Sequence, residues 1–587
     1  MNKDRIAENF LPNVERGEKI VVYQMLTRLF GNKQSANIPF GTIEENGVGK
    51  FSDIDDHALS SIADLGITHI WYTGVIEHAL LTDYRKYGIP LDDADVVKGR
   101  AGSPYAIKDY YDVNPDLADQ VEIRMTEFGS LIDRTHQHQL KVIIDFVPNH
   151  VARRYQSDAK PAGTKDLGEE DDPELAFYPM NNFYYLPGES FQVPDGYNPL
   201  GSLHDHPTKD HHFEEIPAKV SGNNVFKGKP DINDWFETVK LNYGIEYGNT
   251  EKKHFQPVPD TWIKMKDILF FWAKKDIDGF RCDMAEMVPV EFWKWVIPQV
   301  KSINKEILFI AEIYNPDQYR NYLSTGKFDY LYDKVQLYDT LKQIIQGKGK
   351  TSHITEVWKS LKDMNPRMLR FLENHDEQRI ASSFFAGDPF KATPAMAVSG
   401  FLSSGPVMIY FGQEVGETGS GIAGFSGEDG RTTIYDYWGV PSHQKWMNDG
   451  KFDGGKLNGR EKDLRNIYKR ILNICKSHPA IREGHFFDLH AYNSYLDNTG
   501  NESIYYFLRF TGDKHLLILL NFSEIGIADV EITIPITINN QTLFPNEAEI
   551  PARDLMDRLN NIVIKSNGDH RQLKVSFDPH TCYVVEF

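Results

Sequence analysis

The chain has 587 residues, which is too long for one ordinary domain and predicts two or three. Its composition, with 41% hydrophobic and 25% charged residues, is that of a globular protein. The formal net charge of −20 argues against nucleic acid or an anionic membrane surface as a partner, whereas a neutral substrate would be indifferent to it.

Three scattered cysteines, Cys282, Cys475 and Cys582, are too few for a disulfide framework or a zinc site. The N-terminus has no apolar core of signal-peptide length, and no run of about 18 apolar residues occurs that could span a membrane. We therefore expect a cytoplasmic protein from the sequence as written, or a periplasmic or secreted one if a leader was removed. The sequence does not indicate the oligomeric state.

Eight short apolar runs recur along the chain and are separated by segments of helical periodicity. They lie at 19–26, 67–73, 141–147, 277–283, 307–313, 328–335, 367–374 and 406–414. Between the first two, Leu59, Ile62 and Leu65 share one helical stripe, which predicts a helix that stops at Gly66. Uniformly apolar strands that alternate with helices indicate a parallel sheet buried on both faces, and eight is the number that closes a TIM-type barrel. The predicted fold class is α/β, a (β/α)8 TIM barrel formed by residues 1–150 and 258–484.

Two further regions differ from the barrel in composition and in hydrophobic pattern. Residues 151–257 are rich in Pro, Gly, Asp, Asn and aromatics, and a structureless loop of that length is uncommon, so we predict a small domain inserted after the third strand. Residues 485–587 contain β-rich runs separated by turn residues, which predicts a C-terminal antiparallel β-sandwich.

Polar residues cluster where several barrel strands end. Because the carboxyl ends of parallel barrel strands face one cleft, we expect these side chains to converge there. They are Asp145, Asn149, His150, Arg281, Asp283, Glu312, Glu373, Asn374, His375 and Asp376. Arg281 and Asp283 are two apart on a strand and therefore point to the same side. The alternative interpretation is a set of satisfied salt bridges.

These residues fall in four short motifs: "DFVPNH" (145–150), "GFRCDMAE" (279–286), "FIAEIY" (309–314) and "LENHDEQR" (372–379). In this order they resemble the signatures of the α-amylase family of retaining glycoside hydrolases, glycoside hydrolase family 13. The resemblance implies that Asp283 is the nucleophile, Glu312 the general acid/base and Asp376 the transition-state stabiliser. It also implies that substrate is bound by Tyr105, His150, Arg281 and His375.

The chemistry of such an enzyme requires these residue types. One carboxylate must be ionised to attack, and a guanidinium on the same strand face favours its charged form. The second must carry a proton, which requires a drier or more negative setting. Arg281 is therefore interpreted as holding Asp283 anionic, and Asp283 and Asp376 as keeping Glu312 protonated.

The chain departs from the family pattern at two places, one that concerns the leaving side of the substrate and one that concerns calcium. After the nucleophile, many members carry a lysine–histidine pair, whereas this chain has Ala285, Glu286 and Met287, so recognition of the leaving side differs. The resemblance also implies calcium as a cofactor, with Asn149 matching one ligand of a site between barrel and insert. A second family calcium loop, matched by "EENGVGKF", has few acidic residues here.

The sequence thus predicts an α-amylase-like enzyme that hydrolyses α-1,4 linkages of starch and maltooligosaccharides, its α-glucan substrates, by double displacement. A 4-α-glucanotransferase or a neopullulanase- or cyclomaltodextrinase-type activity on the same machinery is the alternative. A non-catalytic glucan-binding member is a remote one, because all three catalytic carboxylates are present.

Overall fold

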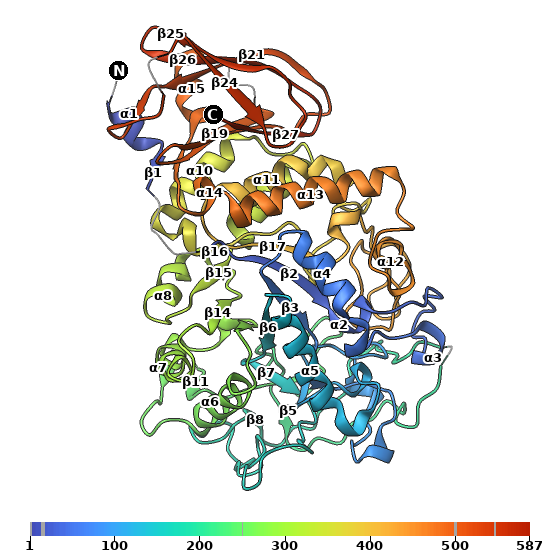
Figure 1. Ribbon diagram of the computed structural model, residues 1–587. Helices are drawn as coiled ribbons and strands as arrows, with labels where there is room; N and C mark the ends of the chain where they lie inside the picture. The colour runs from blue at the N-terminus through green and yellow to red at the C-terminus, as the bar shows by residue number, and fades with distance from the viewer. Residues whose placement is uncertain (1–2, 13–17, 203, 249, 498–501, 545–546) are drawn as a thin grey trace.

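A closed barrel of eight parallel strands forms the centre of the molecule (Figure 1). The computed structural model describes all residues except 1–2, 13–17, 203, 249, 498–501 and 545–546. Each barrel strand falls within one of the predicted apolar runs. In chain order they are β2 (Val21–Leu26), β3 (His69–Thr73), β6 (Lys141–Phe146), β13 (Gly279–Cys282), β14 (Leu308–Ala311), β15 (Tyr330–Tyr332), β16 (Met368–Leu369) and β17 (Val407–Tyr410).

The strands follow one another around the barrel in chain order. β17 pairs in parallel with β2, and a parallel bridge between Arg370, just after β16, and Val407 closes the ring. The (β/α)8 prediction is confirmed. Since both faces of each strand are covered, by the barrel interior and by the helices, the uniformly apolar sequence of the runs is explained.

Several helices that surround the barrel are amphipathic, whereas α11 (Thr393–Phe401) is buried on all sides. In α4 (Asp56–Asp64), Leu59 and Ile62 are buried, and the Asp55 side chain caps the first turn by accepting a hydrogen bond from the Ala58 N–H at 2.9 Å. The same arrangement, with an apolar stripe on the barrel, recurs in other helices. The longest are α5 (Arg124–Gln137), α6 (Asp260–Ala273), α7 (Val290–Lys301) and α13 (Gly459–Ser477).

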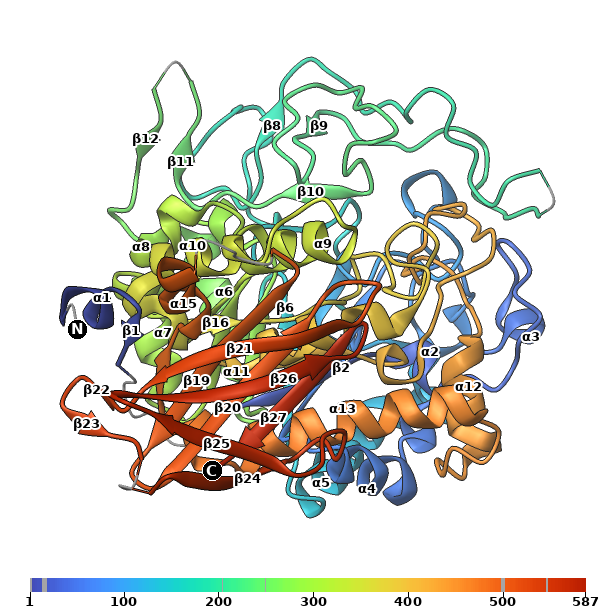
Figure 2. The ribbon, with the colours of Figure 1, turned by 90° about the horizontal axis from the view of Figure 1, so that it is seen from above.

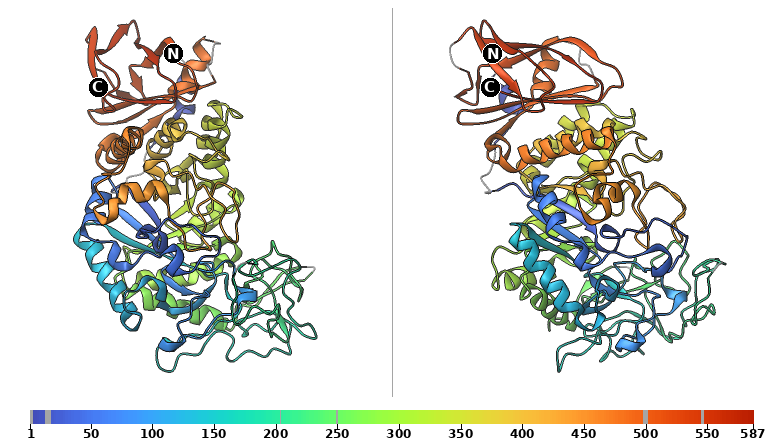
Figure 3. Two further views of the ribbon diagram at one scale, coloured as in Figure 1. Left: turned by 90° about the vertical axis from the view of Figure 1, so that its right-hand side faces the viewer. Right: turned by 45° about the vertical axis from the view of Figure 1, so that its right-hand side comes forward.

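The segment between β6 and α6 projects from the barrel as a body with little regular structure (Figure 3). It is anchored by β7 (His150–Ala152), which pairs antiparallel with β10 (Thr238–Lys240). A second short ribbon joins β8 (Tyr185–Leu186) to β9 (Ala218–Lys219). The β7–β10 ribbon lies next to the strand ends, so the insert forms one wall of the space above the barrel.

The C-terminal region forms one antiparallel sheet that bends at β24 (Glu549–Asp554) into two layers, as predicted for a sandwich. Successive side chains of β19 (Ile504–Thr511) point to opposite faces of the sheet and pack in two different cores. Tyr506 and Leu508 face the core between the layers, whereas Tyr505 and Phe507 pack against the barrel core. Figure 2 shows these strands on the side of the barrel away from the insert.

The N-terminal segment differs from the predicted division of the chain. β1 (Phe10–Leu11), which the prediction includes in the barrel region, pairs antiparallel with β18 (His485–Phe487) at the edge of the C-terminal sheet. Ile6 and Phe10 pack on the core of that sheet. The first residues of the chain therefore extend the C-terminal sheet, because pairing covers an edge strand that would otherwise expose its backbone donors.

Among the residues that the structure describes, no helix is long and apolar enough to cross a membrane.

Candidate active site

Arg281 lies at the centre of a group of buried carboxylates. Its Nη1 is 2.8 Å from Asp283 Oδ1 and 3.3 Å from Asp145 Oδ1, and its Nη2 is 2.7 Å from Glu312 Oε2. The register of the barrel explains this arrangement, because β13 lies between β6 and β14 and pairs Arg281 directly with Asp145. One guanidinium therefore contacts carboxylates from three adjacent strands.

His375 organises the opposite side of the group. The Gln24 amide donates to its Nδ1 at 2.8 Å, which leaves the imidazole proton on Nε2. Nε2 lies 3.0 Å from Asp376 Oδ2 and 2.6 Å from the Tyr105 hydroxyl. Asp376 thereby joins the site from the loop after β16, and 44% of its side-chain surface remains exposed, because it faces the open cleft.

The environments of the carboxyl groups differ. Burial raises the pKa of Asp283, and Arg281 opposes that rise. Burial also raises the pKa of Glu312; Arg281 lowers it, while Asp283 and Asp376 raise it further. Burial alone would raise the pKa of Asp376, but His375 and Arg281 outweigh it and lower the pKa to about 2. Asp376 therefore stays ionised, whereas the pKa values of Asp283 and Glu312 are both raised: neighbouring carboxylates, Asp145 and Asp376 in the case of Asp283, add to the effect of burial, and Arg281 opposes it at both.

Glu312 is held from three directions. Besides the ion pair with Arg281, its Oε2 accepts from the Met284 N–H at 2.9 Å and its Oε1 from the Tyr314 hydroxyl at 2.7 Å. Tyr314 is not among the residues predicted from the sequence, although it stands two positions after Glu312 in "FIAEIY". The same two-residue spacing that joins Arg281 to Asp283 is the signal that could have identified it.

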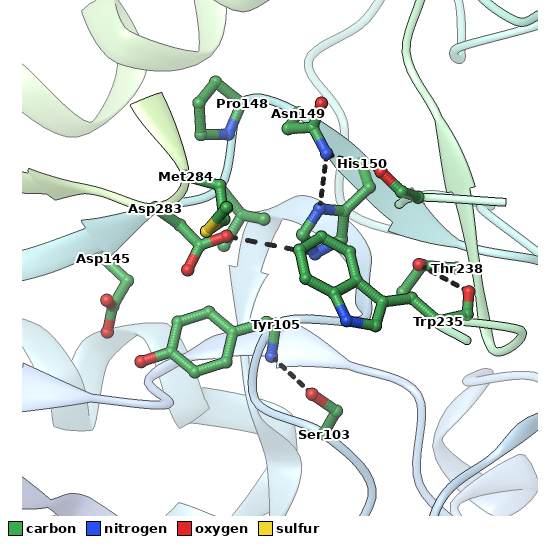
Figure 4. Close-up of polar contacts among 12 residues, drawn as sticks. Ser103, Tyr105, Asp145, Pro148, Asn149, His150, Trp235, Thr238, Asp283 and Met284 are labelled. Carbon is green, nitrogen blue, oxygen red and sulfur yellow. Dashed lines mark hydrogen bonds and ion pairs between the residues drawn. The ribbon is translucent and has the colours of Figure 1, made fainter. Parts of the chain in front are cut away.

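A cavity of about 460 Å³ opens over these groups. Figure 4 shows Tyr105, His150, Trp235 and Asp283 around the same space. His150 Nε2 is 4.0 Å from Asp283 Oδ2, and burial lowers the pKa of His150 to about 4, so the imidazole is neutral. Trp235 of the insert lies with its ring 5.2 Å from that of His150. No periodicity in the turn-rich insert could have indicated Trp235.

A neighbouring cavity of about 360 Å³ continues the cleft past Asp376. Both cavities are bounded by Ile232 and Asn233 of the insert and by the loop around Phe425 and Tyr435 that follows β17. The cleft therefore has walls from two segments and room for more than one sugar ring.

Of the polar residues expected to converge at the strand ends, Glu373 and Asn374 do not line the cleft. The Glu373 carboxylate pairs with Arg379 Nη1 at 2.9 Å and accepts from the Ile380 N–H at 2.6 Å. Asn374 accepts the N–H groups of Asp376 and Glu377 and shapes the loop. For these two residues the salt-bridge and turn interpretation is the correct one.

The surroundings of Asn149 do not fit the calcium ion that the resemblance implies. Its carboxamide oxygen, the atom that would bind the ion, accepts a hydrogen bond from Lys240 Nζ at 2.8 Å, and its amide donates to the Gly222 carbonyl at 2.8 Å. Lys240 is 2% exposed. Lys240 Nζ thus occupies the carboxamide oxygen that would bind the ion, so the predicted metal ligand Asn149 is instead a partner of Lys240.

Comparison with known proteins agrees with this geometry. The family described as "Alpha amylase, catalytic domain" matches residues 24–484. The barrel, the cleft and the match to this family together define a carbohydrate-active enzyme. It is either a glycoside hydrolase or a transferase that uses the same type of active site. The chain belongs to the α-amylase family.

Individual relatives are distant. Alpha-amylase 3 of Dictyoglomus thermophilum is 22% identical over 416 residues, covering 65% of this chain and 68% of that protein. A cyclomaltodextrin glucanotransferase of a Bacillus species is 23% identical over 416 residues, covering 67% of this chain, which spans only 49% of that relative. A maltogenic α-amylase structure from Thermotoga neapolitana has a TM-score of 0.60 at 17% identity, covering 97% of this chain and 98% of that one.

Proposed function

We propose that the protein is a retaining glycoside hydrolase that cleaves α-1,4-glucosidic bonds of starch and maltooligosaccharides by double displacement. The observation that carries the proposal is that Arg281 bridges Asp283 and Glu312 beside a cleft that Asp376 also lines. In this proposal Asp283 is the nucleophile, Glu312 the general acid/base and Asp376 the stabiliser of charge on the ring.

The first half of the reaction forms a bond between Asp283 and the sugar. The proton of Glu312 passes to the glycosidic oxygen as that bond breaks, and Asp283 attacks the anomeric carbon to give a glycosyl ester. Tyr314 and the Met284 N–H hold the Glu312 carboxylate that remains. In the second half, Glu312 takes a proton from water, the water oxygen bonds to the anomeric carbon, and Asp283 leaves.

Neighbouring side chains orient the sugar. Neutral His150 has its Nε2 proton toward the cavity, because Asn149 contacts its Nδ1 at 3.2 Å, and it can donate to a sugar hydroxyl. Tyr105 and Trp235 offer aromatic surface to the ring faces, and Asp376 accepts from hydroxyls or meets the developing positive charge.

A transglycosylase or cyclodextrin-hydrolysing enzyme is the second candidate. It is favoured by relatives such as a cyclomaltodextrinase of a Bacillus species, 21% identical over 523 residues, covering 86% of this chain and 73% of that protein. The leaving side also lacks the lysine–histidine pair, since Ala285 and Glu286 stand there. In a transglycosylase a sugar hydroxyl would resolve the ester, whereas a cyclodextrin-hydrolysing enzyme would use water.

Two measurements test the proposal. Proton NMR of freshly cleaved maltooligosaccharide should show the α-anomer first, because two inversions restore the configuration, and a burst of β-anomer would refute double displacement. A product profile on maltoheptaose, pullulan and cyclodextrins then separates the candidates. Products longer than the starting maltoheptaose would indicate transfer, and preferential attack on cyclodextrins would indicate a cyclomaltodextrinase.

A further inference from the structure

A second group of carboxylates lies outside the active site, on the ribbon formed by β4 (Ile76–His78) and β5 (Ile107–Val113). Glu77, Asp109, Asp112 and Asp158 each offer one oxygen, and these oxygens all lie within 4.8 Å of one another. Two ligands on opposite sides of a calcium ion, each about 2.4 Å from it, stand about 4.8 Å apart. The four oxygens are therefore close enough together to contact one ion.

Glu77 is the member whose charge has no hydrogen-bonding partner. It is 1% exposed, and neither carboxylate oxygen has a hydrogen bond. The nearest cation among the described residues, Lys108, has its Nζ 4.0 Å away and donates instead to Asp92 at 3.1 Å and to the Pro90 carbonyl. A buried carboxylate without donors is expensive to maintain, so a ligand is expected beside it.

The other three members are held in place but retain free lone pairs. Asp109 Oδ2 accepts from the Asp158 and Ala159 N–H groups at 2.9 and 3.1 Å. Asp112 and Asp158 share Arg124 Nη2, which is 3.3 Å from Asp158 Oδ2. Arg124 compensates part of the charge from the edge of the group, and toward Glu77 the nearest cation is Lys108, 4.0 Å away and hydrogen-bonded elsewhere.

We infer that Glu77, Asp109, Asp112 and Asp158 bind a divalent cation, and that calcium is the preferred ion. The four candidate ligands are carboxylate oxygens without nitrogen or sulfur, which suits calcium and magnesium and disfavours zinc or copper. Their irregular arrangement, on a ribbon whose register shifts on both sides of Glu77, suits calcium better than the strict octahedron of magnesium.

The position of the site indicates what the ion does. Glu77 lies on β4, Asp109 and Asp112 lie on β5, which begins just after Tyr105, and Asp158 lies in the first loop of the insert. A cation bound to all four would tie the entry of the insert to the barrel. It would do so at a place distinct from Asn149, where Lys240 already donates to the carboxamide oxygen.

Calcium titration of the full-length protein, first stripped with EDTA, tests the inference. We expect isothermal titration calorimetry to show one calcium ion per chain. The midpoint of thermal unfolding should rise by about 2 °C at a hundredfold excess over Kd. Glu77→Gln keeps the shape of the side chain and should lose both effects. Asp231→Asn, a matched change at a carboxylate of the insert that is 78% exposed, should keep both.

If Glu77→Gln does not fold, Asp158→Asn at the protein surface serves in its place and should weaken calcium binding at least about tenfold. Wild-type protein that binds no calcium would overturn the inference. So would equal binding by wild type and Glu77→Gln. A Glu77→Gln variant that is more stable than a calcium-insensitive wild type would show that the carboxyl group holds a proton instead.

Discussion

Two groups of four carboxylates each contain three buried members and one that reaches solvent, but they differ in where the positive charge lies. One group is in the cleft, and the other is formed by the β4–β5 ribbon and the first loop of the insert. In the cleft, Arg281 lies among Asp145, Asp283 and Glu312, with Asp376 held by His375. On the ribbon, Arg124 reaches only one edge and leaves Glu77 without a donor.

The difference shows how buried carboxylates can suit either catalysis or cation binding, depending on where the nearby positive charge lies. In the cleft three carboxylates share one central guanidinium, and Asp376, held by His375, has a lowered pKa whereas Asp283 and Glu312 have raised ones. A retaining glycosidase needs carboxylates in such unequal settings. An edge guanidinium leaves a local excess of negative charge, which a divalent cation can neutralise. The predictions that follow change one charge at a time.

The largest effect is expected from Asp283→Asn. The amide cannot form the glycosyl ester, so kcat should fall roughly 10³-fold or more, with the unfolding midpoint little changed. A fluorinated glucosyl inhibitor should label Asp283 in the wild type. Activity close to wild type in the variant, or label on Asp376, would contradict the assignment.

Arg281→Ala should lower kcat/KM by roughly 10²-fold and move both limbs of its pH profile. Arg281 lowers the pKa of Asp283 and of Glu312, so its removal favours the neutral acid at both. The acidic limb, set by ionisation of Asp283, and the alkaline limb, set by loss of the Glu312 proton, should each shift upward by roughly one unit.

Arg281→Lys is the matched control, because it keeps the charge but not the planar fork. Its limbs should stay near those of the wild type while kcat falls. If neither limb moves in a folded Arg281→Ala protein, the guanidinium has only a structural role.

The smallest effect concerns Lys240, a buried cation without a carboxylate partner among the described residues. Burial lowers its pKa to about 7, against about 10.4 in an unfolded chain. Between these values the unfolded state binds more protons, so the contribution of Lys240 to stability rises with pH, by up to about 1.4 kcal/mol per pH unit. The stability of the wild type relative to Lys240→Met should therefore increase from pH 7 to pH 9.

Urea denaturation at pH 7, 8 and 9 measures this difference. Lys305→Met, at a side chain that is 88% exposed, serves as control and should track the wild type at every pH. A constant difference between wild type and Lys240→Met would mean that Lys240 is charged throughout this range.

The strands and the central part of the cleft follow from local features of the sequence. Apolar runs of strand length form the barrel because hydrophobic side chains leave water on both faces of a parallel sheet. The two-residue repeat of a strand places Arg281 and Asp283 on one side, and the structure joins them at 2.8 Å. Glu312, Asp376 and His150 are predicted through the resemblance of the four motifs to those of the α-amylase family.

Three contacts could be found only in the tertiary structure, because each joins residues that are distant in the chain. Lys240 is 91 positions from Asn149, and its Nζ donates to the carboxamide oxygen that the family resemblance assigns to a calcium ion. Glu77 and Asp158 come together from the ribbon and the insert, and Phe10 reaches the C-terminal sheet from the other end of the chain. Such contacts leave no periodic pattern in the sequence, because the residues that build the fold are not the residues that make the contacts.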